Sequence, residues 1–155
     1  MPSATTLQSR TISARDPRLA AWRSFLRAHA RVVRSLESEL VDEQGMALTD
    51  YDVLVQLAAA PERRLRMSEL ADGLLLSRSG ATRLVDRLVG EGLVERVVCE
   101  TDRRGQWASL TDTGHQRLRR ATPTHLRGVA QHFLDHLGPE DLAGLERMLE
   151  PIARD

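Results

Sequence analysis

The segment SRSGATRLVDRLVGEGLVERVVCETDRRGQWASLT, residues 77–111, decides the fold of this chain. Its first half places apolar residues at helical spacing and predicts a helix from Ser77 to Gly90 or Gly92, with an inward face made of Ala81, Leu84, Val85 and Leu88. Its second half has two short runs, LVERVVC (93–99) and QWASLT (106–111), around the polar turn ETDRRG (100–105). These runs predict a β-hairpin directly after the helix.

Three further helices are predicted before this segment. Ser68 opens a short helix, SELADGLL, and residues 62–66 (ERRLR) are expected to be a short polar connection to it. Upstream, the run VLVQLAAA predicts a helix that ends at Pro61, and the Thr49 hydroxyl is expected to cap the backbone N–H near Asp52. The first helix is expected to begin at Asp16-Pro17 and to run to about Val41, before Gly45.

Two more helices are predicted after the hairpin. Asp112-Thr113-Gly114 leads into a helix that runs through the 130s, with a kink expected at Pro123. The sequence EDLAGLERMLEPIA (140–153) predicts a last amphipathic helix. The order is therefore four helices, two strands and two helices. This is a mostly α fold with a small β-hairpin wing, an α/β winged helix-turn-helix.

The apolar stripes divide the chain into three regions. Residues 49–111 are expected to form a winged helix-turn-helix domain with its own core, and residues 1–16 a flexible N-terminal arm. The terminal helices carry apolar stripes for which this central unit offers no obvious partner. Residues 17–48 and 112–155 are therefore expected to form a helical dimerisation region. Plain core packing is the alternative interpretation of the stripes.

The composition limits the class of protein. The chain has 155 residues, 22 basic residues that are all Arg, 22 acidic residues and 41% apolar residues, which is typical of a globular protein. It has no run of 18 apolar residues, and the N-terminal MPSATTLQSR has no apolar stretch. A membrane span and a secretory signal are therefore not expected, and the cytoplasm is the expected compartment. The single cysteine, Cys99, excludes an intrachain disulfide.

Polar side chains on the helix that begins at Ser77 indicate a contact with nucleic acid. Arg and hydroxyl residues fall largely outside its apolar face, and the first turns of a recognition helix present such residues to base edges in the major groove. Arg can hold a guanine through two hydrogen bonds. Segment 63–105 holds nine Arg against seven acidic residues, a small local surplus of positive charge. A solvated arginine face is the alternative.

The turn of the hairpin is the second candidate contact. Arg103 and Arg104 lie at its tip, and an Arg in that position can enter the narrow, electronegative minor groove. Asp102 can orient one of the two guanidinium groups through a charge-assisted hydrogen bond. An ordinary polar turn is the alternative, since Asp and Gly are common turn residues.

In these residues, the chain resembles the MarR family of winged helix-turn-helix regulators. The segment SELADGLLLSRSGATRLVDRLVGEGLVER (68–96) resembles the family's helix-turn-helix region. The stretch DRRGQWASLTDTG (102–114) resembles its wing signature, with matches at Asp102, Arg104, Leu110, Thr111 and Gly114. The resemblance covers about residues 19–152 and is carried mainly by the wing signature.

The resemblance implies a homodimer, built from the first helix and the last two, that binds a pseudo-palindromic operator. It further implies a repressor that a small molecule, or oxidation, releases from DNA. The implied recognition-helix residues are Ser77, Arg78, Ser79, Thr82, Arg83 and Arg87, and the implied wing residues are Asp102, Arg103 and Arg104. No cofactor is implied.

The family's effector pocket lies between the dimer helices and the winged domain. The matching positions here are Trp22, Phe25, Leu26 and His29 on the first helix and Tyr51, Leu54 and Val55 on the second. His29 and Tyr51 can offer polar contacts in a mostly apolar cavity. Simple core packing is the alternative for the apolar members.

Four other functions have weaker support in the sequence than a DNA-binding regulator. Cys99 could sense oxidants, but acidic neighbours disfavour the reactive thiolate. His132 and His136 are spaced for one helix face, with His125 seven residues earlier, but two ligands make a weak metal site. No G-x-S-x-G motif, Gly-rich phosphate loop or His/Glu metal motif indicates an enzyme. A protein-interaction module without DNA binding remains the last alternative.

Overall fold

The computed structural model describes residues 12–98 and 106–154 and is mostly helical, as expected. Three short strands accompany six α-helices and two single 3₁₀ turns in these ranges. In chain order the elements are α1 (Leu19–Gln44), α2 (Leu48–Ala59), η1 (Pro61–Arg63), β1 (Arg64–Arg66), α3 (Met67–Gly73), α4 (Arg78–Gly90), β2 (Val94–Val98), β3 (Gln106–Leu110), α5 (Asp112–His132), η2 (Leu134–His136) and α6 (Pro139–Ala153).

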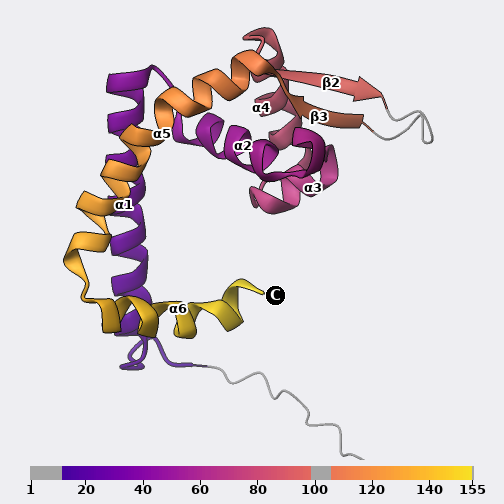
Figure 1. Ribbon diagram of the computed structural model, residues 1–155. Helices are drawn as coiled ribbons and strands as arrows, with labels where there is room; N and C mark the ends of the chain where they lie inside the picture. Colours follow the sequence, from indigo (N-terminus) through magenta and orange to yellow (C-terminus); the bar gives the residue numbers. More distant parts are fainter. Residues whose placement is uncertain (1–11, 99–105, 155) are drawn as a thin grey trace, which may run out of the picture.

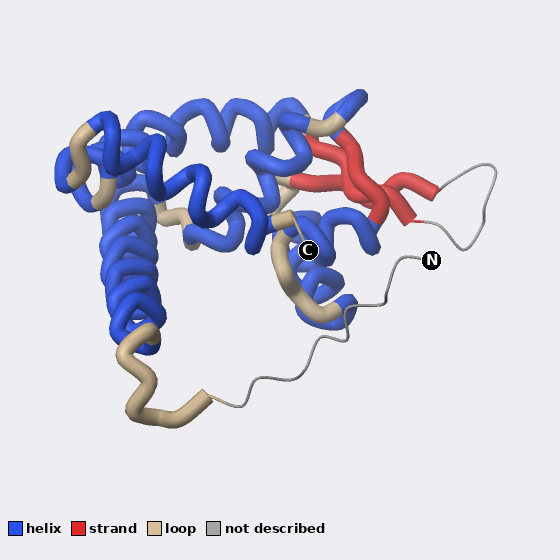
Figure 2. Tube along the Cα trace, turned by 90° about the horizontal axis from the view of Figure 1, so that it is seen from below, coloured by secondary structure: helices blue, strands red, loops and turns tan. Residues whose placement is uncertain are grey.

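The helices and strands gather into two parts (Figure 1). Helices α2, α3 and α4 and the three strands form one compact group, which we call the winged unit. Helices α1, α5 and α6 form the second part, which we call the arm; α1 and the second half of α5 run side by side, and α6 crosses their far end. Figure 2 shows the three strands together at one end of the molecule.

The sheet contains a strand that the sequence analysis missed. Its order is β1-β3-β2, with both neighbours of β3 antiparallel to it. Residues 62–66 were expected to be a polar connection, but Arg64–Arg66 pairs with Trp107–Ser109. Because β1 has only three residues and alternates Arg, Leu and Arg, it lacks a β-branched pattern. Its strand conformation comes from the backbone hydrogen bonds of β3.

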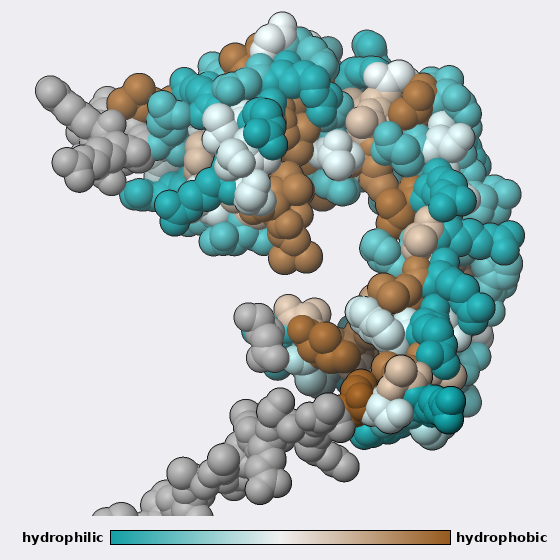
Figure 3. All heavy atoms as spheres, turned by 180° about the vertical axis from the view of Figure 1, so that it is seen from behind, coloured by the Kyte–Doolittle hydropathy of each residue, from teal (hydrophilic) through white to brown (hydrophobic). Residues whose placement is uncertain are grey.

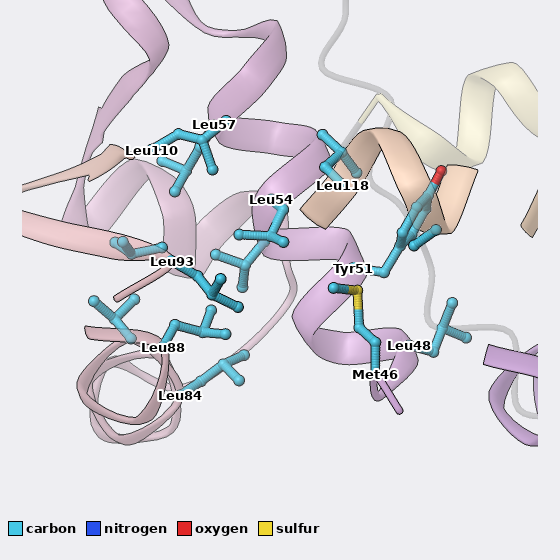
Figure 4. Close-up of a cluster of buried hydrophobic side chains, with 14 of the residues drawn as sticks. Met46, Leu48, Tyr51, Leu54, Leu57, Leu84, Leu88, Leu93, Leu110 and Leu118 are labelled. Atoms are coloured by element: carbon cyan, nitrogen blue, oxygen red, sulfur yellow. The ribbon is translucent and has the colours of Figure 1, made fainter. Parts of the chain in front are cut away.

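The core of the winged unit forms around α2. Leu54, Leu57, Val85 and Leu88 are fully buried, and the four predicted inward residues of α4 are all buried, which confirms that prediction. Figure 4 shows Leu54 among leucines from α4, from the sheet and from the start of α5. Aliphatic residues from every element of the winged unit therefore share one core.

Helix starts were predicted with mixed success. Ser77 caps α4 by accepting a hydrogen bond from Gly80 N at 3.1 Å, as expected. The predicted cap Thr49 is wrong, because this residue lies inside α2, which begins at Leu48. Helix α3 begins at Met67, one residue before the predicted start at Ser68. At the starts of both helices, a glutamate carboxylate accepts a hydrogen bond from a backbone N–H. Glu37 of α1 accepts from Leu48 N at 2.6 Å, and Glu69 accepts from Arg66 N at 2.8 Å.

The two long helices of the arm also differ in extent from the prediction. The first begins at Leu19 rather than Pro17 and continues to Gln44, where Gly45 ends it with a φ of 59°. Pro123 lies inside α5, and α5 changes direction along its length in Figure 1. Helix α5 ends at His132 instead of running through the 130s, and the separate 3₁₀ turn η2 follows it.

Close packing and polar contacts join α1 to α5. Gly128 permits the close approach, because a Cβ atom there would lie 2.7 Å from Leu36 Cδ2. Glu43 of α1 accepts two hydrogen bonds from α5, one from Arg127 Nη2 at 2.5 Å and one from Thr124 Oγ1 at 3.1 Å. Both apolar packing and hydrogen bonds therefore hold α5 against α1.

Candidate nucleic-acid interface

The outward face of α4 carries the predicted recognition residues. With Ala81, Leu84, Val85 and Leu88 buried against the winged unit, the remaining polar side chains of the helix are left in solvent. All six predicted recognition residues are exposed: Ser77, Arg78, Ser79, Thr82, Arg83 and Arg87. This face of α4 presents hydroxyl and guanidinium groups together, which is the chemistry that base edges and phosphates accept.

The first turn of α4 combines a cap with a small cluster of hydroxyl groups. Ser77 Oγ lies 3.2 Å from Ser79 Oγ, besides accepting from Gly80 N. A Cβ atom at Gly80 would lie 3.1 Å from Ser77 Oγ, so the glycine keeps this cap uncrowded. Ser77 is therefore primarily a capping residue, whereas Ser79 has its hydroxyl on the outward side.

The three arginines on the outward face of α4 differ in their contacts with other side chains. Within the described part of the chain, Arg78 and Arg83 make no ion pair and no side-chain hydrogen bond. Arg87 donates from Nη1 to Asp50 Oδ2 of α2 at 2.6 Å. This hydrogen bond raises the pKa of Arg87 above its ordinary value, so the side chain is a fixed cation.

A second ion pair connects α4 to the wing strands. Arg96 of β2 donates to Asp86 Oδ1 of α4 from Nη2 at 2.7 Å and from Nε at 3.1 Å, and to Gln106 Oε1 of β3 at 2.6 Å. These three residues line an open depression of about 450 Å³ together with Met67 and Thr82. The helix and the base of the wing are therefore fixed relative to each other on this side.

Sequence reasoning missed Asp50, Asp86 and Arg96 as parts of the site. Asp50 pairs with a residue 37 positions away, and Arg96 with one ten positions away. The sequence carries no local pattern that distinguishes such pairs from ordinary surface charges. The capping position of Ser77, in contrast, has a local signal and could be found.

The predicted wing tip lies outside the described residues. Asp102, Arg103 and Arg104 fall between β2 and β3, in the stretch that the structure does not describe, and so does Cys99. Their predicted roles in minor-groove contact and in redox sensing therefore stay predictions. What the structure does show is the base of the wing: β2 pairs with β3 from Val94–Leu110 to Val98–Gln106.

The predicted effector residues do not form one site within a chain. Trp22, Phe25 and Leu26 are 53%, 44% and 43% exposed on α1, and Trp22, Phe25 and His29 stack in a row with ring centroids 6.0 and 6.2 Å apart. Leu54, in contrast, is fully buried in the core of the winged unit. Further along α1, Leu36 and Leu40 belong to the same core as α2, and Glu37 accepts a hydrogen bond from Leu48 N of α2.

Tyr51 bridges the winged unit to the arm. It is buried, and its ring stacks on that of His125 of α5 with centroids 4.4 Å apart. Burial lowers the pKa of His125, while the carboxylate of Asp52 acts in the opposite direction. Burial also raises the pKa of Asp52, with a further contribution from Glu37 of α1. Three titratable groups, Asp52 of α2, His125 of α5 and Glu37 of α1, therefore lie near one another where these helices meet.

The predicted histidine pair does not form. His132 is the last residue of α5, whereas His136 belongs to the separate turn η2, so the two do not share a helix face. His132 Nε2 lies 2.5 Å from Glu39 Oε1 of α1. Among the described residues, no cluster of three or more His, Cys, Asp or Glu could hold a metal ion, and no helix has the length and hydrophobicity of a membrane span.

Known proteins share both the sequence and this arrangement. AbsC, a MarR family transcriptional regulator from Streptomyces coelicolor, is 38% identical and superposes with a TM-score of 0.86 over 93% of this chain and 97% of that one. The chain belongs to the MarR family. The sequence model of that family matches residues 44–105, which is most of the winged unit together with the wing turn.

Two further relatives bear on the role of this MarR family chain. Sco3205 of Streptomyces coelicolor, a family member whose crystal structure is in complex with DNA, is 38% identical with a TM-score of 0.85, over 94% of this chain and 90% of that one. The transcriptional repressor MprA of Escherichia coli K12 is 34% identical over 86 residues. That match covers 56% of this chain but only about half (49%) of MprA. The family is one of DNA-binding transcriptional regulators.

Proposed function

We propose that this chain is a sequence-specific repressor that binds a pseudo-palindromic operator as a homodimer. The outward face of α4 is the observation that carries the proposal: Arg78 and Arg83 are exposed beside Ser79 and Thr82, over a helix whose opposite face is buried. The resemblance to Sco3205, which was crystallised with DNA, supports duplex DNA as the partner.

The arm supports the proposed homodimer. Helix α6 has no buried residue, although it carries exposed apolar side chains such as Met148 and Ile152. Figure 3 shows that apolar surface gathers on the inner side of the C-shaped molecule. A two-fold dimer formed through α1, α5 and α6 would cover such a surface and place two α4 helices about 34–36 Å apart, one turn of DNA.

We also propose that a small molecule regulates DNA binding at the junction of α1, α2 and α5. Tyr51 and His125 offer polar edges there, at the contact between the winged unit and the arm. A ligand that changes this contact would change the spacing of the two α4 helices and thereby release the operator. The exposed ring row Trp22–Phe25–His29 belongs to this proposal only if the partner subunit completes the pocket.

Selection of genomic fragments tests the proposed function. Fragments of the native genome retained by the protein should share a pseudo-palindromic sequence, and binding to it should weaken steeply with salt. Arg83→Ala should lower the affinity for that sequence and alter base preference at one position of each half-site, by about 1–3 kcal/mol. Arg119→Ala, which removes an exposed arginine of α5, is the matched control and should bind as the parent does. Unchanged binding and unchanged base preference in Arg83→Ala would refute the role of α4.

The wing is tested separately, because its tip lies outside the described residues. We propose that Arg104 enters the minor groove and that Arg103 contacts phosphate. Arg104→Lys keeps the charge but loses the planar fork, so it should weaken operator binding more than non-specific binding. Arg103→Lys should weaken both slightly and equally. Equal losses for the two variants, measured at one salt concentration, would reduce the wing to a non-specific contact.

A further inference from the structure

Asp50 is an unusual residue for the inside of a winged unit. Its side chain is only 8% exposed, and its Oδ2 accepts the hydrogen bond from Arg87 Nη1 at 2.6 Å. Its other oxygen, Oδ1, is buried and finds no hydrogen-bond partner in the part of the chain that the structure describes. Burying a carboxylate in this way costs free energy, and the pair with Arg87 offsets part of that cost.

Arg87 stands apart from the other arginines of α4. It follows Arg83 by one helical turn and Arg78 by nine residues, or about 13 Å along the helix axis. Recognition helices read bases mainly with their N-terminal residues. Arg87 is on the flank of α4 that faces α2, and a helix docked in this way would hold it beyond the bases, toward the edge of the groove.

The guanidinium of Arg87 donates one hydrogen bond to Asp50 and has further N–H donors for another partner. Its side chain is 47% exposed, and a guanidinium has five N–H donors, of which one reaches Asp50. The nearest other carboxylate, Glu91 one turn later, lies 4.0 Å away and accepts no hydrogen bond from it. The remaining donors thus face solvent in a fixed orientation.

We propose that Asp50 is a positioning residue for DNA recognition, which holds the guanidinium of Arg87 toward a backbone phosphate at the edge of the groove. This assignment rests on the proposed function and narrows it: Arg83 reads a base, whereas Arg87 fixes the register of α4 on the backbone. Asp50 contributes without touching DNA, because an ordered guanidinium loses less side-chain entropy when the phosphate binds.

The direction in which Asp50→Asn changes the affinity for the operator distinguishes a positioning role of Asp50 from a simple electrostatic effect. Asp50→Asn removes a negative charge close to the DNA-binding face, and charge alone would then strengthen binding to every duplex. A positioning role has the opposite result for the operator. We expect Asp50→Asn to weaken operator binding by about two- to tenfold, the cost of ordering one long side chain. Binding to random duplex should stay equal or become tighter.

A double-mutant cycle tests whether Asp50 acts through Arg87. Arg87→Met should weaken operator binding more than random-duplex binding, because the register contact belongs to the specific complex. It should leave base preference unchanged and reduce the slope of log operator affinity against log salt by about 0.9, one phosphate contact. In that background, Asp50→Asn should no longer weaken operator binding, and only the small gain from the lost negative charge should remain. The double variant has no buried charge left unpaired, so it is expected to fold even where Arg87→Met alone does not. Circular dichroism and thermal unfolding confirm that each variant is folded at the assay temperature.

Arg87→Lys provides an independent measurement with the native Asp50 in place. It keeps the charge and the ion pair but lacks the planar fork, so operator affinity should fall while the salt slope is retained. The proposal is overturned if folded Asp50→Asn binds the operator as tightly as the parent or more tightly. It is also overturned if Asp50→Asn weakens binding equally without Arg87, or if Arg87→Met changes base preference. If the parent and Arg119→Ala bind no duplex with specificity, the proposed function itself fails.

Discussion

The winged unit and the arm bury their apolar residues in different ways. In the winged unit, Leu54, Leu57, Val85 and Leu88 are fully buried within one chain. In the arm, α1 buries only Leu36 and Leu40 of its 26 residues, and α6 buries none. The core of the winged unit is closed within one chain, with Leu36 and Leu40 of α1 and Leu118 of α5 at its border, whereas the rest of the arm leaves apolar surface exposed.

Because of this difference, we expect substitutions in the winged unit to change the stability of one chain and substitutions in the arm to change the association of two chains. Substitutions in the core of the winged unit should act on the folding of one chain. Substitutions on the exposed face of the arm should act on the association of two chains, which we propose occurs there. The two tryptophans allow each part to be followed alone, since Trp22 belongs to α1 and Trp107 to β3.

The largest effect is expected from Leu54→Ala. Leu54 is fully buried at the centre of the core, so its truncation should lower the free energy of unfolding by about 2–5 kcal/mol. Urea unfolding followed by the fluorescence of Trp107, in a Trp22→Phe background, measures the loss. A loss below 1 kcal/mol, which is the size of an ordinary surface substitution, would show that the winged unit does not depend on this core.

Phe25→Ala should weaken dimerisation by roughly 10- to 100-fold, which corresponds to burial of one aromatic side chain at about 1.5–3 kcal/mol. Phe25 is 44% exposed on α1 and stacks on Trp22. Sedimentation equilibrium measures the dissociation constant. Leu75→Ala, which truncates a leucine that is 94% exposed in the winged unit, is the control and should leave the constant unchanged. Equal effects of the two variants would remove the distinction between the parts.

Gly114→Ala tests the joint between the two parts. Gly114 lies in the first turn of α5, and a Cβ atom there would lie 2.0 Å from the carbonyl oxygen of Leu93. The backbone must shift to admit it, so we expect a loss of about 1–3 kcal/mol in stability. Gly90→Ala is the control, because no atom lies within 4 Å of a Cβ there and alanine favours the helix. Thermal unfolding of both variants should give changes of opposite sign.

The smallest effect is a pH dependence from His125. Because burial lowers its pKa in the folded state, that state binds fewer protons than the unfolded chain. Its contribution to stability is present above about pH 6.5, the unfolded pKa, and is lost as the pH falls through the lower folded pKa. The raised pKa of Asp52 acts with the opposite sign, in a more acidic range.

Between pH 7.5 and 5.5 we therefore expect a loss of less than about 1 kcal/mol, reduced by partial exposure of the imidazole. His125→Gln should flatten this dependence in urea unfolding measured across the range. The exposed His136 supplies the control, since His136→Gln should leave the dependence in place. If His125→Gln keeps the full slope, the junction of α1, α2 and α5 does not titrate as described.

Much of the fold could be predicted from the sequence, because its local signals are strong. The spacing of Ala81, Leu84, Val85 and Leu88 predicted α4 and its buried face, and Ser77 predicted its cap. The predictions failed where the cause is distant in sequence. Strand β1 depends on β3, and the start of α2 at Leu48 depends on Glu37 of another helix.

The candidate site divides in the same way. Helical spacing was enough to identify Arg78 and Arg83 as outward residues, because it depends on α4 alone. The pairing of Arg87 with Asp50, and of Arg96 with Asp86, requires the packing of three elements and has no local pattern. For the effector residues, the sequence could not show that Leu54 is core while Trp22 and Phe25 are exposed.

The central claim is that two winged units read DNA and that the arms hold them one turn apart. Hydroxyl-radical footprinting of the parent on its selected operator tests this claim most directly. We expect two equal protected regions related by a two-fold axis, with centres separated by about 10–10.5 base pairs, or a multiple of that spacing. A single protected region on one half-site, at protein concentrations that saturate the operator, would contradict it.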